Sequence, residues 1–185
     1  MFENYKSKKI ISYNSSEKFF KKFKKKTILC HGVFDIVHPG HIRHFAHCKQ
    51  KADILIVSLT KDAFIKKGTY RPMVPQDLRA FNLSSLELVD YVIIDKNKNP
   101  ETLLKKIKPN YFAKGLEYAD LKNPLTKKEK NIVESYGGKM IFSPGDYVLS
   151  SSKIIQQAEP DLKYEKLKLL MNTENINFND IKKIL

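Results

Sequence analysis

Two histidines, His38 and His41, stand three residues apart in the stretch His38-Pro39-Gly40-His41. At a helix start, this spacing lets both side chains point at one ligand. Two imidazole donors suit a reaction that builds negative charge on a phosphorus centre and on a leaving pyrophosphate. Gly40 brings backbone N–H groups and the positive end of the helix dipole close to an anion. We therefore expect a phosphate site here, with His38 and His41 as catalytic residues.

The residues before this pair strengthen the interpretation. Two histidines at a helix start could simply be caps or ordinary polar residues. Here they end a longer stretch, in which His31 is followed by Gly32-Val33-Phe34-Asp35 directly after a short apolar strand. Loops between a strand and a helix commonly bind nucleotide phosphates. The length and position of the stretch therefore favour function over capping.

Strand and helix signals alternate along the chain. Short apolar runs bounded by Gly, Pro or Asn predict strands, and longer runs with helical periodicity predict helices. The predicted strands are 27–31, 53–59, 91–94, 110–113 and 139–142, and the predicted helices are 40–51, 76–86, 100–107, 126–136 and 151–157. Gly137-Gly138 is a C-cap signal for the helix before it.

This alternation predicts an α/β fold. Right-handed crossovers join such strands into a mostly parallel sheet with helices on both faces. Ligands bind such sheets beyond the carboxyl ends of the strands, where the strand order reverses. The first predicted strand ends at His31-Gly32, so the loop that follows is the expected site.

We expect one principal domain, residues 27–157, with an extension at each end. A chain of 185 residues suffices for one domain with a sizeable core. Residues 1–26 are rich in lysine and include three phenylalanines at helical spacing, which predict a helix that docks on the domain. Residues 158–185 are expected to form a helical tail or linker.

The net charge of +14 comes almost entirely from lysine. Only Arg43, Arg71 and Arg79 are arginines, which leaves 31 of the 34 basic residues as lysines. Nucleic-acid-binding proteins rely on arginine for bidentate contacts, so nucleic acid is a disfavoured partner. Lysine excess beside many Asn and Ile residues is also typical of compositional drift in the encoding genome. The positive field would still attract polyanionic small molecules.

The sequence carries no membrane or disulfide signal. No apolar run reaches the roughly 18 residues that a membrane span needs, and no apolar signal region follows the N-terminal lysines. Cys30 and Cys48 fit neither a disulfide framework nor a metal-ligand spacing, and Cys30 falls inside an apolar strand. We therefore expect a cytoplasmic protein without a structural metal site.

The sequence resembles the cytidylyltransferase-like branch of the nucleotidyltransferases. Gly32-Val33-Phe34-Asp35 followed by His38-Pro39-Gly40-His41 is similar to the signature of that branch, and the resemblance extends over about residues 27–156. It implies a Rossmann-like, doubly wound, five-stranded parallel sheet. It also assigns Gly32, Val33, Phe34 and Gly40 to nucleotide binding, whereas Asp35 could either hold the loop or contact the acceptor.

Three further elements resemble the sugar-phosphate adenylyltransferase domain of ADP-heptose synthase-type proteins. They are Arg71-Pro72 with Arg79, Lys114-Gly115 with Tyr118, and Ser150-Ser151-Ser152 before Lys153-Ile154-Ile155. They are similar to that domain's R-P…R segment, its K-G-x-x-Y element and its S-T-T-x-I-I motif.

The resemblance gives these elements roles in phosphate and nucleotide binding. Lys67, or Lys66 beside it, would hold the triphosphate, although either could be a solvated loop charge. The guanidinium forks of Arg71 and Arg79 would bind substrate or phosphate, although Arg79 could instead be a structural ion-pair partner. Lys114 and Gly115 would meet the nucleotide at a strand end. The serines Ser150, Ser151 and Ser152 would bind the β- and γ-phosphates at a helix start, where a single N-cap is the simpler alternative.

The resemblance implies transfer of a nucleoside monophosphate, with ATP as the favoured donor, to a sugar 1-phosphate. Pyrophosphate would leave, and Mg²⁺ would be held mainly by the triphosphate. The alternative is CTP-dependent transfer to a polyol or amino-alcohol phosphate. The arginine of the R-T-x-G motif found in glycerol-phosphate enzymes is missing from Gly145-Asp146-Tyr147-Val148-Leu149, which disfavours a glycerol-phosphate acceptor. A nucleic-acid-binding module is a distant third.

The same resemblance implies two protein partners. Relatives of this type are commonly homodimers, so we expect a homodimer. In some relatives a short helical linker joins this domain to a carbohydrate kinase, and residues 160–185 resemble that linker. A sugar kinase, in the same protein or on a separate chain, is therefore an expected partner.

Overall fold

Five apolar runs form the central sheet. They are β1 (Thr27–Gly32), β2 (Ile54–Thr60), β3 (Tyr91–Asp95), β4 (Tyr111–Gly115) and β5 (Lys139–Ser143). All residues of β2 are buried, as expected for a strand covered on both faces. The computed structural model describes residues 7–66 and 71–144. The chain divides into two units, Met1–Val148 and Leu149–Leu185, and the sheet belongs to the first.

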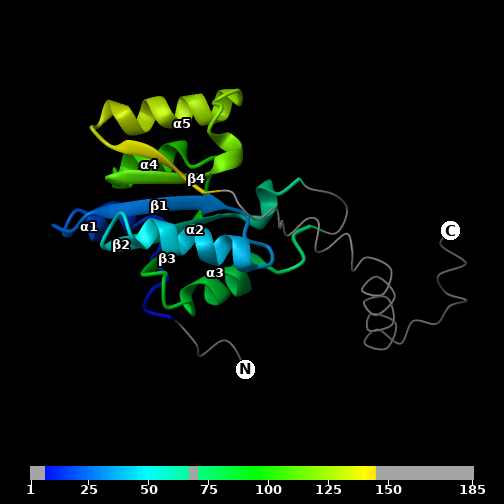
Figure 1. Ribbon diagram of the computed structural model, residues 1–185. Coiled ribbons are helices and arrows are strands. Elements are labelled where there is room, and N and C mark those ends of the chain that lie inside the picture. Colours follow the sequence, from blue (N-terminus) through cyan, green and yellow to red (C-terminus); the bar gives the residue numbers. More distant parts are fainter. Residues whose placement is uncertain (1–6, 67–70, 145–185) are drawn as a thin grey trace, which may run out of the picture. The chain divides into compact units, whose positions relative to one another are not determined.

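The strands are all parallel and lie in the order β3-β2-β1-β4-β5 (Figure 1). In the centre, Cys30 of β1 is aligned with Val57 of β2 and with Ala113 of β4. The chain builds outward from β1 to β3, then returns to the centre and builds outward through β4 and β5. The strand order therefore reverses between β1 and β4, where doubly wound sheets bind their ligands.

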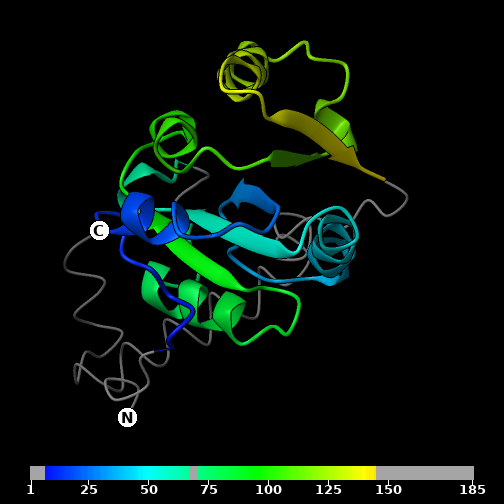
Figure 2. The same ribbon diagram turned by 90° about the vertical axis from the view of Figure 1, so that its left-hand side faces the viewer.

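Helices cover both faces of the sheet (Figures 1 and 2). On one face lie α2 (Pro39–Lys49) and α3 (Gln76–Ser84), and on the other lie α1 (Ser16–Phe20), α4 (Glu101–Ile107) and α5 (Pro124–Ser135). Two short 3-10 helices, η1 (Asp62–Phe64) and η2 (Leu116–Tyr118), follow β2 and β4. This arrangement confirms the doubly wound α/β fold that the sequence predicts.

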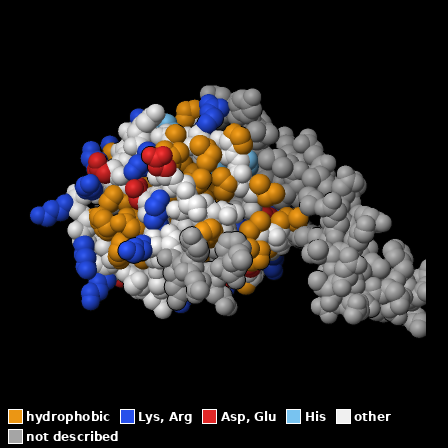
Figure 3. Space-filling model, turned by 90° about the horizontal axis from the view of Figure 1, so that it is seen from below, with side chains coloured by type: hydrophobic (Ala, Val, Ile, Leu, Met, Phe, Trp, Pro, Cys, Tyr) orange, Lys and Arg blue, Asp and Glu red, His pale blue; other side chains and the backbone are white. Residues whose placement is uncertain are grey.

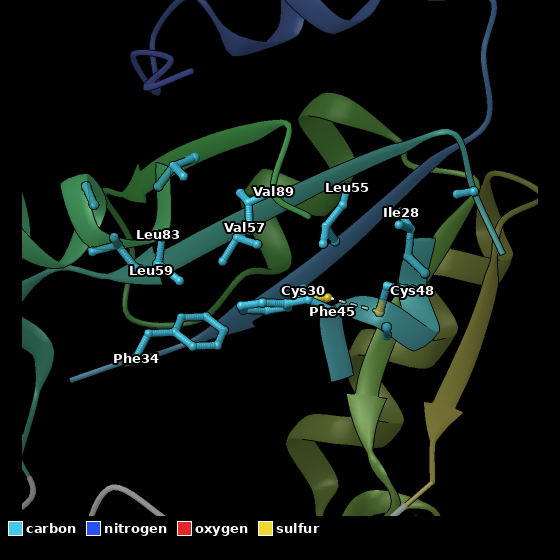
Figure 4. Packing of buried hydrophobic residues seen from close by; sticks show 14 residues of the cluster. Ile28, Cys30, Phe34, Phe45, Cys48, Leu55, Val57, Leu59, Leu83 and Val89 are labelled. Atoms are coloured by element: carbon cyan, nitrogen blue, oxygen red, sulfur yellow. Dashed lines mark hydrogen bonds between the residues drawn. The ribbon is translucent and has the colours of Figure 1, made fainter. Parts of the chain in front are cut away.

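The core consists of two apolar layers, one on each face of the sheet. Because side chains alternate along a strand, Ile28 and Cys30 of β1 enter one layer and Leu29 enters the other. In the first layer, Phe45 and Cys48 of α2 pack onto the sheet (Figure 4). The two cysteines, which the sequence does not pair, face each other there with their Sγ atoms 3.4 Å apart.

The N-terminal extension differs from the predicted helical segment. Within its described part, residues 7–26, the helix is α1, and the residues before it include an extended stretch. There Ile10 forms a parallel bridge with Val92 of edge strand β3, with hydrogen bonds at both flanking positions. The unpaired backbone groups of an edge strand favour this pairing over continuation of the helix.

The docking of the phenylalanine stripe is confirmed. Phe19, Phe20 and Phe23 surround the ring of Tyr91, with ring centroids 5.0, 5.5 and 5.6 Å from it. Aromatic pairs at these separations stabilise a fold beyond the area they bury. The extension is thus fixed to the sheet at its β3 edge.

The predicted C-cap of α5 is also confirmed. Gly137 has a φ of 85°, a conformation that an L side chain would strain. Its N–H and that of Gly138 donate to Glu134 and Val133, which satisfies two carbonyls at the helix end. The predicted helix 151–157 and the tail 158–185 lie outside the described residues.

On the face drawn in Figure 3, most Lys and Arg side chains lie toward the left-hand side, interspersed with acidic, hydrophobic and uncharged groups. This distribution agrees with a general lysine excess. None of the helices within residues 7–66 and 71–144 has the length and apolar character that crossing a membrane requires.

Candidate active site

The loop after β1 is shaped by Gly32 and Phe34. A Cβ atom at Gly32 would lie 3.1 Å from the Phe34 ring, so a side chain here would require the ring to shift by a few tenths of an ångström. Phe34 itself has a φ of 50°, an uncommon conformation for a residue with a side chain. This conformation buries its ring against Phe45 and sets it edge-on to His41, with ring centroids 5.0 Å apart. The loop is therefore packed into the core where α2 begins.

His38 and His41 cap the start of α2 reciprocally. His38 is the N-cap residue, and its Nδ1 atom accepts a hydrogen bond of 3.2 Å from the N–H of Gly40. The N–H of His38 in turn donates to Nδ1 of His41 at 3.4 Å. The two rings stack with centroids 3.8 Å apart. The two side chains therefore cap the helix, which was one of the two roles that the sequence suggested, and each keeps a second ring nitrogen that the cap does not use.

This cap fixes the tautomer of both imidazoles. A ring nitrogen that accepts a backbone N–H carries no proton, so in each neutral ring the proton resides on Nε2. Burial lowers the pKa of His38 and, with the charges of His38 and His44 adding to the shift, lowers the pKa of His41 to about 3. Both rings are therefore neutral at pH 7 and carry one N–H donor each, at Nε2.

The backbone at this helix start differs from the expected anion site. Pro39 has no N–H, the N–H of Gly40 is bound by His38, and those of His41 and Ile42 donate to the His38 carbonyl at 2.9 and 3.3 Å. These N–H groups already have partners within the protein. The donors available to a phosphate are consequently the two Nε2–H groups, supported by the helix dipole.

Asp35 holds two loops together. Its side chain is fully buried, with Oδ1 accepting the N–H of Val74 at 2.9 Å and Oδ2 lying 2.5 Å from Nε of Arg71. Of the two roles that the sequence left open, the structure shows the loop-holding one. Arg71 is thereby anchored between β2 and α3, at the same end of the sheet as the histidine pair.

Arg79 takes the structural role that the sequence gave as its alternative. It has no exposed surface, and its guanidinium donates to the carbonyls of Val33, Thr60 and Val74 and to the carboxylate of Asp62. These contacts use four of its five N–H donors, and a side chain without exposed surface cannot meet a ligand. Arg79 therefore positions the Val33 loop instead of binding phosphate itself.

Lys114 is held by an ion pair that sequence spacing does not show. Its Nζ contacts the carboxylate of Glu129, lies 3.2 Å from the hydroxyl of Thr126 and sits 4.5 Å from the ring centroid of Tyr118. Burial raises the pKa of Glu129, and Lys114 opposes that shift. The K-G-x-x-Y spacing thus reflects a contact between Lys114 and Tyr118. If Lys114 contacts a nucleotide, its ammonium group must interact with the nucleotide and with the Glu129 carboxylate at the same time.

His31 is a polar residue of this edge that the sequence did not single out. Its Nδ1 lies 2.8 Å from the Ser58 hydroxyl and its Nε2 lies 3.3 Å from that of Thr60, both on the neighbouring strand β2. Burial and the charge of Lys114 lower its pKa to about 3. The signal was available in the sequence, since two apolar strands both end in hydroxyl or imidazole residues.

The remaining predicted site residues are not brought into this cluster. Lys66 is exposed. Gly115 adjoins Lys114 at the end of β4, and a Cβ there would lie 2.1 Å from the Glu117 carboxylate. Lys67, Ser150, Ser151 and Ser152 lie outside the described residues, so their predicted roles stay predictions.

Three half-buried imidazoles predict an acid-sensitive fold. The pKa values of His31 and His41 fall to about 3, and that of His44 falls to about 4. Below the ordinary value of 6.5, the unfolded chain binds protons that the folded chain does not. The free energy of unfolding should therefore decrease from about pH 6.5 to about pH 4, by at most about 1.4 kcal/mol per pH unit for each histidine.

Urea unfolding at pH 7, 6 and 5 would measure this decrease. The His44→Asn variant should show a slope shallower by up to about 1.4 kcal/mol per pH unit. Equal free energies of unfolding at pH 7 and pH 5 would contradict the assigned neutral histidines.

A parallel sheet in this order, with imidazoles and hydroxyls at the carboxyl ends of its central strands, is typical of α/β nucleotide-binding proteins. A family model described as cytidylyltransferase-like matches residues 29–157, and the chain belongs to that family. This match confirms the nucleotidyltransferase family that the motifs predict.

This chain matches only one part of each of its longer curated relatives. A protein named "Bifunctional protein HldE" from Campylobacter concisus is 44% identical over 99 residues, which cover 52% of this chain and 21% of that protein. A protein of the same name from Helicobacter acinonychis is 40% identical over 114 residues, 60% of this chain and 25% of that one. The matches thus span about a fifth to a quarter of the length of these relatives.

Two solved structures share the fold at low sequence identity. A lipopolysaccharide core biosynthesis protein from Thermoplasma volcanium aligns with a TM-score of 0.51 at 22% identity, over 68% of this chain and 99% of that one. A pantoate-beta-alanine ligase from Francisella tularensis aligns with a TM-score of 0.56 at 17% identity, over 78% and 71%. Both likenesses concern the fold.

Proposed function

We propose that this protein transfers AMP from ATP to a sugar 1-phosphate. A phosphate oxygen of the sugar attacks the α-phosphorus, the bond to the bridging oxygen of the β-phosphate breaks, and pyrophosphate leaves with that electron pair. The product is a nucleotide-diphospho-sugar. The family match, the similarity to proteins named HldE and the motifs at Arg71 and Lys114 support this proposal.

The observation that carries the proposal is the pair of Nε2–H donors on His38 and His41. Their Nδ1 atoms are occupied by the helix cap, which leaves Nε2 as the N–H donor of each ring, at a helix start beside the reversal point of the sheet. Two donors fixed in this way can stabilise the negative charge that develops on the leaving pyrophosphate, without any rearrangement of the protein. Because both rings are neutral, they act as hydrogen-bond donors and not as acids.

Other residues would orient the two substrates. In this proposal Gly32, Val33 and Phe34 line the nucleotide, and Arg71, anchored by Asp35, binds the acceptor phosphate. Lys114 and Gly115 meet the nucleotide from β4. Lys66 or Lys67 and the serines Ser150, Ser151 and Ser152 would hold the triphosphate.

Mg²⁺ fits this site as a companion of the triphosphate. The carboxylate of the loop, Asp35, is already bound by Arg71 and by the N–H of Val74. It is therefore not available as a ligand, which agrees with an ion held mainly by phosphate oxygens. When bound, Mg²⁺ would offset the charge of the triphosphate.

A substrate screen tests the proposal. Pyrophosphate release is measured with each of the four NTPs, with Mg²⁺, against sugar 1-phosphates, polyol phosphates and amino-alcohol phosphates. We expect the fastest release with ATP and a sugar 1-phosphate. Release with CTP and a polyol phosphate would replace this proposal by cytidylyl transfer, and no acceptor-dependent release with any pair would refute nucleotidyl transfer to these acceptors.

The same proposal implies a partner enzyme, a cellular compartment and an assembly state. A sugar kinase, as a fused domain or a separate chain, would supply the phosphorylated acceptor, and the reaction would take place in the cytoplasm. We retain residues 27–157 as the catalytic domain, residues 158–185 as a tail or linker, and a homodimer as the expected assembly.

A further inference from the structure

A cluster of soft metal ligands lies behind the histidine pair. Cys30 of β1 and Cys48 of α2 face each other with Sγ atoms 3.4 Å apart (Figure 4), and a ring nitrogen of His44 completes a set whose atoms all lie within 4.8 Å of one another. His44 and Cys48 are four residues apart on α2 and so lie on one side of the helix. Sequence spacing hid this set because its third member comes from a strand.

The surroundings of the cluster favour a metal that forms a neutral complex. Both cysteines are fully buried in an apolar layer with Phe45. Uncompensated thiolates are costly in such a place, whereas two thiolates with one divalent cation carry no net charge. The site therefore suits a divalent ion and disfavours a monovalent one.

The donor atoms select a thiophilic ion. Thiolate and imidazole bind Zn²⁺ and similar soft ions, and Mg²⁺ requires oxygen ligands in an octahedral arrangement. This set is thus chemically distinct from the Mg²⁺ of the triphosphate. Three protein ligands of the Cys₂His type leave a fourth position for water or another oxygen donor.

His44 is held in place by a second residue. Its Nδ1 lies 2.7 Å from the hydroxyl of Ser143, at the end of β5. A hydrogen bond to one ring nitrogen fixes the ring and leaves the other nitrogen without a proton to bind an ion, an arrangement usual for histidines that bind metals. Ser143 thereby orients His44 in the manner of an outer-shell partner.

We propose that Cys30, His44 and Cys48 form a binding site for Zn²⁺ or a similar thiophilic divalent ion. Binding forms two metal–sulfur bonds and one metal–nitrogen bond, and the two thiol protons pass to solvent. No electron is transferred. The ion would connect β1, the central strand, to α2 one turn beyond His41, and so would fix the helix that carries both catalytic imidazoles.

The composition of the chain makes a direct spectroscopic test possible. Cys30 and Cys48 are its only cysteines, and it contains no tryptophan. Thiolate-to-metal absorption in the ultraviolet can therefore come only from this pair. The chain is prepared without an affinity tag, reduced, freed of metal by a chelator, and titrated with Cd²⁺ or Co²⁺ under argon.

We expect a thiolate-to-metal band that saturates at one equivalent of metal, release of two protons, and protection of both thiols from a thiol reagent. Mg²⁺ should produce none of these changes. Cys48→Ala should abolish the band, and circular dichroism checks its fold. His44→Ala and Ser143→Ala should weaken binding about tenfold or more, and His47→Ala on the same helix should leave it unchanged.

Three results would overturn the proposal. One is the absence of a band at stoichiometric metal with the folded, reduced chain. Another is His44→Ala binding as tightly as the native sequence, which would reduce the site to a thiol pair. The third is a native mass lower by two hydrogens, which would identify a Cys30–Cys48 disulfide. None of these results depends on the substrate screen, so the two proposals can fail separately.

Discussion

His41→Ala is expected to lower turnover at least about a hundredfold while the protein stays folded. Removing one fixed donor to developing charge usually raises the barrier by roughly 2.7–4 kcal/mol. The same substitution removes one member of the helix cap, which costs only about 0.5–2 kcal/mol of stability. Single-turnover pyrophosphate release measures the first effect, and thermal unfolding measures the second. His47→Ala, later on the same helix, is the matched control and should retain turnover.

Two conservative variants separate the cap from the donor. The amide oxygen of His41→Asn can take the place of Nδ1 and preserve the cap, but this side chain lacks an outward donor. The amide nitrogen of His41→Gln reaches the place of Nε2 and restores a donor. We therefore expect Asn to be nearly as slow as Ala and Gln to recover part of the rate. Near-native release by the Asn variant would show that His41 acts only as a cap.

Arg79→Met should lower the free energy of unfolding by at least about 1–3 kcal/mol, the cost of leaving a buried hydrogen-bond acceptor without its donor. It leaves the carbonyls of Val33, Thr60 and Val74 without their donor, in a place with no exposed surface. Urea unfolding at pH 7 measures the loss. Turnover should fall as well, because the Val33 carbonyl is part of the loop that leads to His38.

Arg79→Lys distinguishes fork geometry from charge. The ammonium keeps the positive charge beside Asp62, but it cannot reach three carbonyls that lie in different directions. We expect the lysine variant to keep most of the instability of Arg79→Met. Full rescue by lysine would show that charge alone matters, and a loss below about 1 kcal/mol for methionine would place Arg79 outside the structural framework.

The sequence predicted the fold because its signals are local. The apolar run of β2 is buried throughout, and the Gly137-Gly138 cap stands where α5 ends. Alternation of such elements leaves few possible topologies. The sequence also located the histidine pair, since a helix start immediately after the first strand must lie at the ligand end of the sheet.

The partners of charged residues could not be predicted in the same way. Arg79 meets Asp62 and Lys114 meets Glu129 only because the loops and helices between them fold back. The residue types indicated that these two cations were important. Whether each of them binds a ligand or a carboxylate of the protein depends on tertiary packing. The same is true of Cys30 and Cys48, which a strand and a helix bring together.

The bridge between Ile10 and Val92 has a consequence for the behaviour of the whole molecule. The N–H of Val92 donates to Lys9, and its carbonyl accepts from Ile11, so the N-terminal segment occupies backbone groups that β3 would otherwise present to solvent. An uncovered edge of this kind is a template for strands from other molecules. The segment thus protects this edge from pairing with strands of other molecules. A shortened chain that lacked it would expose the edge strand and should aggregate more readily.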